Sequence, residues 1–187
     1  MRELSLHILD LVQNSIEAHA TQVALTIIEN SKDNLFSICI CDNGGGMDKE
    51  LLQQVFDPFV TTRTTRRIGL GLPLFQMSAK RCGGYLKIES EPGVGTKVEA
   101  VYQYHHIDRP PLGKICETIR LIMIANPELD FSYTHFVETA SFSISTREVT
   151  AILGDIPLSH PDVIIWLTNF LTDRFTNLYG GVCDENH

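Results

Sequence analysis

Three glycine-containing segments carry most of the chemistry that this sequence can offer. They are Asp42–Met47 (D-N-G-G-G-M), Gly69–Leu72 (G-L-G-L) and Gly93–Thr96 (G-V-G-T). Glycine permits a positive φ angle and a close approach of the backbone to a ligand, and both a plain turn and a phosphate cradle use these properties. Taken one at a time, each segment therefore fits a turn as well as a nucleotide site.

The segments do not match the two commonest phosphate-binding motifs. No stretch reads G-x-x-x-x-G-K-[ST], the phosphate loop of many nucleotide hydrolases. The pair Gly69 and Gly71 lacks the third glycine of a dinucleotide fingerprint and does not directly follow an expected strand. Both of those nucleotide-binding folds are therefore disfavoured.

Asp10 and Asn14 are four residues apart in a segment with helical periodicity, which puts both side chains on one helix face. The amide oxygen of Asn14 is a suitable hard ligand for a Mg²⁺ ion that keeps several waters and bridges phosphates. Asp10 could act as a general base, orient water around the ion, or be a surface carboxylate.

Three arginines, Arg63, Arg66 and Arg67, lie among four threonines in the segment 60–68. Arginine binds phosphate oxygens through several fixed donors. In a chain of net charge −8, this local cluster suggests the neutralisation of an anion beside the following G-L-G-L segment, although a solvated loop is the alternative.

Composition restricts the function classes. The chain has 187 residues, 43% of them hydrophobic and 20% charged, so it can bury a core of one domain with a smaller appendage. No apolar run approaches the roughly 18 residues of a membrane-spanning helix. Its acidity disfavours nucleic acid as a partner. The five cysteines are irregularly spaced, so we expect them reduced and the protein cytoplasmic.

The chemistry-bearing residues need elements that position them, and the periodicity of the first 104 residues supplies both helices and strands. The resulting order predicts an α+β fold, a two-layer sandwich of helices on a largely hairpin-connected sheet. The expected helices cover 4–20, 49–56 and 72–81, and the expected strands cover 23–29, 35–41, 85–89 and 96–104.

Two consecutive prolines, Pro110 and Pro111, indicate a linker over 105–111 and a separate C-terminal α+β module over 112–187. We expect the module to pack on the first domain, because hairpin-like sequence over 129–145 could cover an open sheet edge. Its other expected elements are helices over 114–125 and 161–179, and a short helix after Ser145 that ends at Gly154.

The motifs form an ordered set: Asp10-x-x-x-Asn14, then D-N-G-G-G-M, then F-D-P-F-V-T-T-R over 56–63, then G-L-G-L, then G-V-G-T. This set resembles the ATP-binding domain that DNA gyrase B, heat-shock chaperones, sensor histidine kinases and MutL share (the GHKL superfamily, with a Bergerat-type fold). The resemblance covers residues 1 to about 104. The third and fourth motifs look most like those of histidine kinases, whereas 14–21 is also similar to MutL.

The resemblance implies a role for each matching residue. Asn14 would bind Mg²⁺, and Asp10 stands where other members carry a water-activating glutamate. Asp42 would read the adenine amine, Gly44 and Gly46 would let Met47 close over the ring, and Thr96 would support Asp42. The segment Gly69, Leu70, Gly71 and Leu72 would hold phosphates at a helix start, where backbone amides attract anions.

The same resemblance implies ATP and Mg²⁺ as cofactors. No phosphoacceptor domain precedes Asn14 in this sequence, and His7 reads as a packed helix residue, so we expect phosphate transfer in trans to a protein partner in signalling. The alternative is an ATPase or a nucleotide-gated binding module without kinase activity. A homodimer is compatible with either. The sequence identifies neither the partner nor the role of residues 112–187.

Overall fold

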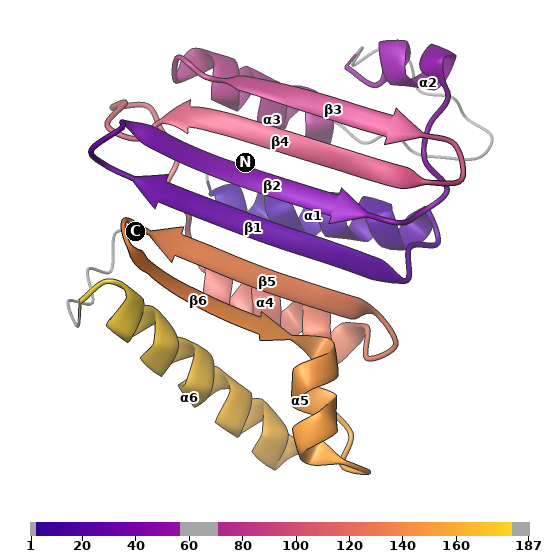
Figure 1. Cartoon of the computed structure of the whole chain (residues 1–187), viewed down its shortest axis with the longest axis vertical. Helices are drawn as coiled ribbons and strands as arrows, with labels where there is room; N and C mark the ends of the chain where they lie inside the picture. The colour runs from indigo at the N-terminus through magenta and orange to yellow at the C-terminus, as the bar shows by residue number, and fades with distance from the viewer. Residues whose placement is uncertain (1–2, 57–70, 181–187) are drawn as a thin grey trace.

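The structure is a computed structural model that describes residues 3–56 and 71–180. Its centre is a six-stranded sheet with the strand order β3-β4-β2-β1-β5-β6. Helices α1, α3 and α4 lie against one face of this sheet, and α6 lies along the β6 side (Figure 1). The predicted α+β sandwich is confirmed. None of the helices in the described part of the chain combines the length and apolar character needed to span a bilayer.

The first half of the chain builds four strands and three helices. Alternate residues of β1 are buried, which is the pattern of a strand with one face on a core. Helix α3 ends before Gly83, whose φ of +69° gives a left-handed C-terminal cap. The elements are α1 (Leu4–Glu17), β1 (Gln22–Asn30), β2 (Leu35–Asp42), α2 (Lys49–Gln54), α3 (Gly71–Arg81), β3 (Tyr85–Glu91) and β4 (Gly95–Gln103).

The second half adds two strands and three helices. Ser145 caps α5 in a capping box with Glu148, as its spacing predicts. Helix α6 begins with Pro161 at its first position and is capped by the His160 side chain. The elements are α4 (Ile115–Ala125), β5 (Asp130–Val137), β6 (Ala140–Ser145), α5 (Thr146–Leu153) and α6 (Pro161–Leu178).

The C-terminal segment extends the N-terminal sheet. Strand β5 pairs in parallel with β1, from Gln22 opposite Asp130 to Glu29 opposite Val137, and β6 returns antiparallel to β5. The linker also contacts α1, because the Leu4 amide donates to the Pro111 carbonyl over 3.0 Å. The expected packing of this module and its 129–145 hairpin are therefore confirmed, and the edge of β1 is covered.

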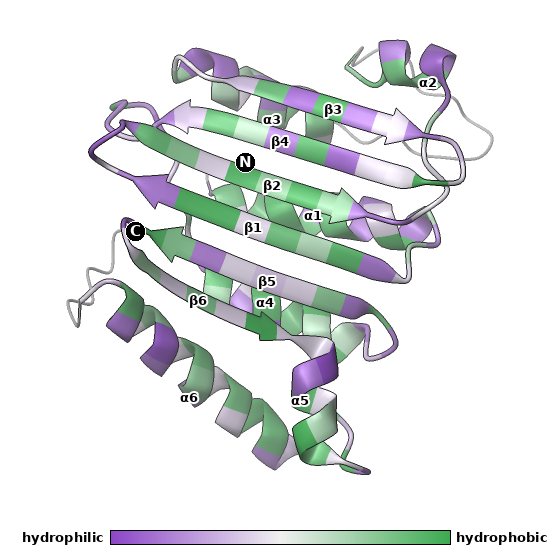
Figure 2. Cartoon of the chain, viewed as in Figure 1, coloured by the Kyte–Doolittle hydropathy of each residue, from purple (hydrophilic) through white to green (hydrophobic). Residues whose placement is uncertain are grey.

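The core lies between the sheet and its helices, and the central strands and the inner helix faces are predominantly apolar (Figure 2). One charged group, Glu29 of β1, is buried at 4% exposure beneath the C-terminal segment. Its Oε1 accepts hydrogen bonds from Tyr179 over 2.5 Å and from His135 Nε2 over 2.9 Å. These bonds, with Arg109 nearby, lower the pKa of Glu29 despite the opposing effect of burial. The ionised carboxylate therefore joins β1 to β5 and to the end of α6.

Candidate functional site

A pocket opens between α1 and the sheet, at the end where β2 finishes and α2 lies (Figure 1). Its wall is mostly apolar and carries few polar groups, which is the usual composition of a small-molecule site. The lining residues come from α1, β2, the loop to α2, α2 itself, α3 and β4: Leu11, Asn14, Ser15, Glu17, Ala18, Ile40, Asp42, Met47, Leu51, Val55, Leu72, Thr96 and Val98.

Asp42, the last residue of β2, is held by three hydrogen bonds. Its Oδ2 accepts from the Ser15 hydroxyl over 2.7 Å, and its Oδ1 accepts from the backbone amides of Gly44 over 2.9 Å and Thr96 over 3.3 Å. Since each carboxylate oxygen has two lone pairs, Oδ2 keeps one for a further donor. The carboxylate is therefore fixed in orientation while still able to accept a hydrogen bond from a ligand.

Thr96 supports Asp42 in two ways. Its amide donates directly to the carboxylate, and its hydroxyl lies 2.9 Å from that of Ser90. Ser90 also accepts a hydrogen bond from the Met47 amide over 2.8 Å. Strands β3 and β4 thus hold both Asp42 and the end of the glycine loop, at Met47.

Two glycines are required by close backbone contacts around Asp42. Gly46 has a φ of +66°, and a Cβ there would lie 2.0 Å from the Glu91 carbonyl oxygen. Gly95 has a φ of +135°, and a Cβ there would lie 1.9 Å from the Asp42 carbonyl oxygen. Any larger residue would push the glycine loop or the start of β4 away from the pocket.

Asp10 lies against the first residue of α3. A Cβ on Gly71 would come within 1.6 Å of Asp10 Oδ2, so the glycine makes room for this carboxylate. Burial raises the pKa of Asp10, and the negative charge of Glu17 on the same helix adds to the effect. A raised pKa makes the carboxylate a better proton acceptor. Asp10 therefore lies beside the start of α3 with the raised pKa that suits a general base.

Asn14 follows Asp10 by one turn of α1 and lines the pocket directly. Among the residues that the structure describes, no three histidine, cysteine or acidic side chains group closely enough to hold a metal ion. A Mg²⁺ ion held through one amide oxygen, water and ligand phosphates needs no such group. The donor set around Asn14 therefore fits Mg²⁺ delivered with a nucleotide.

The structure brings seven of the predicted site residues together around the pocket. Of the remaining predicted residues, Asp10 and Gly71 adjoin each other next to Leu72. Arg63, Arg66, Arg67, Gly69 and Leu70 lie outside the described residues. The seven are Asn14, Asp42, Gly44, Gly46, Met47, Leu72 and Thr96.

Sequence reasoning missed two hydroxyl groups of the site, on Ser15 and Ser90. Ser15 is 4% exposed, and its contact with Asp42 depends on how α1 packs on β2. The available signal was the place of this serine directly after Asn14, which puts it one step round the helix toward the buried face. Ser90 gave none, because its role comes from pairing with Thr96 across β3 and β4.

Comparison with known families matches residues 2–105 to the family described as histidine kinase-, DNA gyrase B-, and HSP90-like ATPase. Two similar proteins are sporulation kinase C of Bacillus subtilis, 36% identical over 93 residues, and the tetrathionate sensor histidine kinase TtrS of Salmonella typhimurium, 37% identical over 82 residues. The aligned parts are 50% and 44% of this chain but only 22% and 13% of those proteins.

A solved structure has the same fold over more of the chain. The crystal structure of the N-terminal domain of a DNA repair protein superposes with a TM-score of 0.53 at 17% identity, over 83% of this chain and 58% of that one. The coverage extends beyond residue 105, which agrees with the continuous sheet that joins β1 to β5.

Proposed function

Because the chain belongs to the family of histidine kinase-, DNA gyrase B- and HSP90-like ATPases, we propose that its pocket binds ATP with Mg²⁺ and that the protein transfers the γ-phosphoryl group to a protein partner in trans. The observation that carries the proposal is Asp42, held by Ser15, Gly44 and Thr96 at the head of a mostly apolar pocket. The kinase names of the relatives support a role in signalling.

Asp42 is the proposed adenine-reading group. An exocyclic amine donates hydrogen bonds, and the free lone pair on Oδ2 can accept one. The rings would lie among Ile40, Val98 and Met47, whose side chains line the same pocket. Guanine carries a carbonyl oxygen where adenine carries the amine, so the carboxylate would repel it and select for adenine.

Asn14 and the start of α3 are the proposed holders of the metal and the phosphates. Bound Mg²⁺ would neutralise phosphate charge and orient the terminal phosphoryl group. The Asn14 side chain offers one oxygen to it, while the amides at the start of α3 attract phosphate oxygens. The arginines at 63, 66 and 67, outside the described residues, are proposed to add positive charge.

Phosphoryl transfer depends mainly on positioning and charge stabilisation, so this site could serve two acceptors. In the kinase reaction an acceptor side chain forms the new bond to phosphorus and ADP leaves. In the alternative, an ATPase, water takes the place of the acceptor and its proton passes to a base. The raised pKa of Asp10 and its place against Gly71 favour this second candidate specifically.

Incubation of the full chain with γ-labelled ATP, Mg²⁺ and the products of neighbouring genes tests the proposal. Label that appears on one of those proteins, and that an Asn14→Ala variant fails to transfer, supports the kinase. Free labelled phosphate without labelled protein supports the ATPase. Absence of nucleotide binding by the folded chain would refute both.

A further inference from the structure

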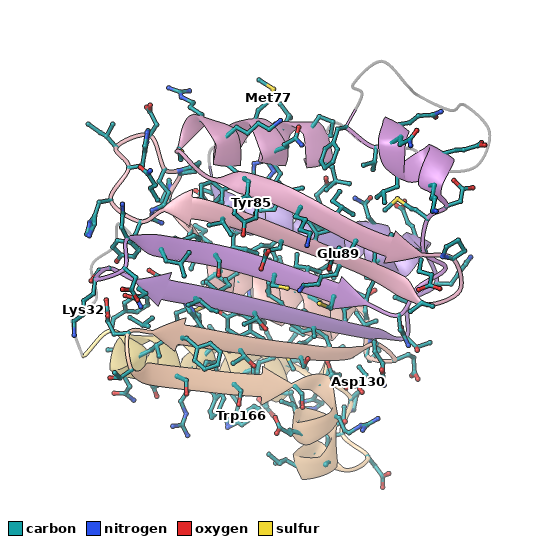
Figure 3. The ribbon with its side chains drawn as sticks, turned by 45° about the horizontal axis from the view of Figure 1, so that its top comes forward. Lys32, Met77, Tyr85, Glu89, Asp130 and Trp166 are labelled. Carbon is teal, nitrogen blue, oxygen red and sulfur yellow. The ribbon has the colours of Figure 1, made fainter. Side chains whose placement is uncertain are left out.

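Helices α5 and α6 meet at a corner of the molecule where a groove opens to solvent. Its volume is about 380 Å³, at the lower end of the range for ligand pockets, so it can accept a few side chains. Figure 3 shows Trp166 on this side of the molecule, close to α5 and away from Met77 on α3. The lining residues include Leu153, Asp155, Ile156, Pro157, Asp162 and Trp166.

The wall of the groove exposes large hydrophobic side chains. Ile156 is 50% exposed and Trp166 is 38% exposed. Ile152 and Ile165, each directly before a lining residue in the chain, are 73% and 60% exposed. The end of α5 is correspondingly hydrophobic in Figure 2. Single exposed hydrophobic residues are normal, but four of them in so short a segment mark an interaction surface.

The groove is held in shape by the connection between the two helices. The Ile156 amide donates to the Leu153 carbonyl over 3.2 Å. The His160 amide donates to the Pro157 carbonyl over 3.0 Å. Between these two turns the Leu158 side chain is buried and belongs to the hydrophobic core. Because the groove is formed before anything binds to it, binding requires little ordering of its lining residues.

The segment that builds the groove carries only negative formal charge. Residues 148–173 contain four carboxylates and no lysine or arginine. Asp155 and Asp162, which line the groove, are exposed, and neither pairs with a lysine or arginine in the part of the chain that the structure describes. The Asp162 carboxylate also offsets the positive end of α6, because it lies in the first turn of that helix. The lining therefore complements a positive charge.

Trp166 begins a row of stacked groups along α6. Its ring stacks on the ring of Phe170 with 5.3 Å between centroids, and the Arg174 guanidinium lies over the other aromatic ring, that of Phe170, at 5.1 Å. An arginine from outside the chain could stack on the exposed indole as Arg174 stacks on Phe170. Tryptophan and arginine are also the side chains that most often dominate the binding energy of protein interfaces.

We propose that the α5–α6 groove is a docking site for a short segment of a partner protein, in which an aliphatic or aromatic side chain lies close to an arginine or lysine. The apolar side chain would fill the groove between Ile156 and Trp166, and the cation would bind Asp155 and Asp162. A second copy of this chain fits less well, because it would bring a molecule of net charge −8 against an acidic surface.

A phage-displayed library of random dodecapeptides, selected on the full chain, tests the chemistry of the partner. We expect the enriched peptides to combine an aliphatic or aromatic residue with arginine or lysine. One enriched peptide without tryptophan is then synthesised and titrated into the chain. Because Trp166 is the single tryptophan of the sequence, its fluorescence reports directly on the groove, and binding should change its emission.

Variants separate the apolar contribution from the charged one, with anisotropy of the labelled peptide as the measurement. Trp166→Ala should weaken binding more than about tenfold. Asp155→Asn combined with Asp162→Asn should weaken it about three- to tenfold and reduce its salt dependence. The matched control, Glu91→Gln combined with Glu128→Gln, removes the same charge from exposed positions elsewhere and should change the affinity less than about twofold. Circular dichroism checks that each variant is folded.

Three results would overturn the inference. One is a selection that enriches no common chemistry or that enriches acidic peptides. Another is a peptide whose affinity is unchanged in folded Trp166→Ala, or is equal in the two charge variants. The third is a concentration-dependent dimer of this chain that Trp166→Ala dissociates, which would assign the groove to a second copy. No nucleotide is present in these measurements, so the inference is tested independently of the proposed ATP site.

Discussion

Replacing Asp42 with asparagine should weaken adenine recognition while leaving the fold intact. In the structure Oδ1 accepts from two backbone amides, so the side-chain carbonyl oxygen of the introduced asparagine must occupy that position. The side-chain NH2 group of the amide then takes the place of Oδ2 and faces the Ser15 hydroxyl, which can rotate and accept a hydrogen bond from it. The new side chain is therefore satisfied, but it offers a donor where the adenine amine needs an acceptor.

The size of the effect follows from the bond that is lost. A hydrogen bond to a charged group contributes about 1.5–3 kcal/mol, and about 1.4 kcal/mol corresponds to a factor of ten in Kd. We expect ATP to bind to Asp42→Asn about ten to a hundred times more weakly. Ser15→Ala, which loosens the carboxylate without removing it, should weaken ATP binding by less than tenfold.

Isothermal titration calorimetry with Mg²⁺ and ATP measures both variants against the original chain, and urea unfolding reports their stability. GTP in the same titrations tests the direction of selectivity, since Asp42→Asn should reduce the preference for ATP over GTP. Unchanged ATP affinity in a folded Asp42→Asn protein would refute the assignment of the pocket as an adenine site.

Three further outcomes follow from the structure. If water is the acceptor, Asp10→Asn should slow phosphate release from ATP at least tenfold, because the substitution removes the base. Equal rates of phosphate release by the variant and the original chain would exclude Asp10 from the reaction. A chain that ends at Tyr104 should have a lower melting temperature, because β1 loses its parallel partner and Glu29 loses His135 and Tyr179. A loss of one kcal/mol lowers the melting temperature of a domain of about 100 residues by about 4–8 °C, so we expect a decrease of at least this size. An equal melting temperature for the two chains would contradict this prediction. Burial against Phe75 lowers the pKa of His7 from 6.5 to about 4, so the unfolded chain takes up a proton first as the pH falls. The unfolding free energy should then drop by about 2 kcal/mol between pH 7 and pH 5, and His7→Phe should reduce this drop, as urea unfolding at the two pH values would measure.

Local patterns predicted the elements well, because their signals are carried by neighbouring residues. The helical spacing of Leu4, Ile8 and Leu11 matches the buried face of α1. The capping box at Ser145 and the end of α5 at Gly154 were also readable, since each depends on contacts within one turn. Boundaries differed by one to three residues, as at the end of α1, where Glu17 is the last helical residue.

Long-range arrangement was harder to predict. The sequence pattern of 129–145 indicated a hairpin and a partner for an open edge, but it could not specify a parallel register of Leu25 opposite Tyr133. The buried bonds between Glu29 and His135 join residues 106 positions apart, and each residue alone reads as ordinary strand sequence. In the pocket, Ser15 shows the same limit, because its partner Asp42 is 27 positions away.

The pairing of β1 with β5 also has a consequence for synthesis of the protein. Gln22 of β1 cannot pair until Asp130 has been synthesised, so the parallel partner of β1 leaves the ribosome long after β1, β2 and β4 can pair. Contacts of such sequence separation form slowly, and an unpaired strand edge is prone to association during the delay. The nascent chain should therefore pass through a stage in which the nucleotide pocket is assembled while the edge of β1 is still exposed. Protection of that edge, rather than assembly of the pocket, would then limit the yield of folded protein.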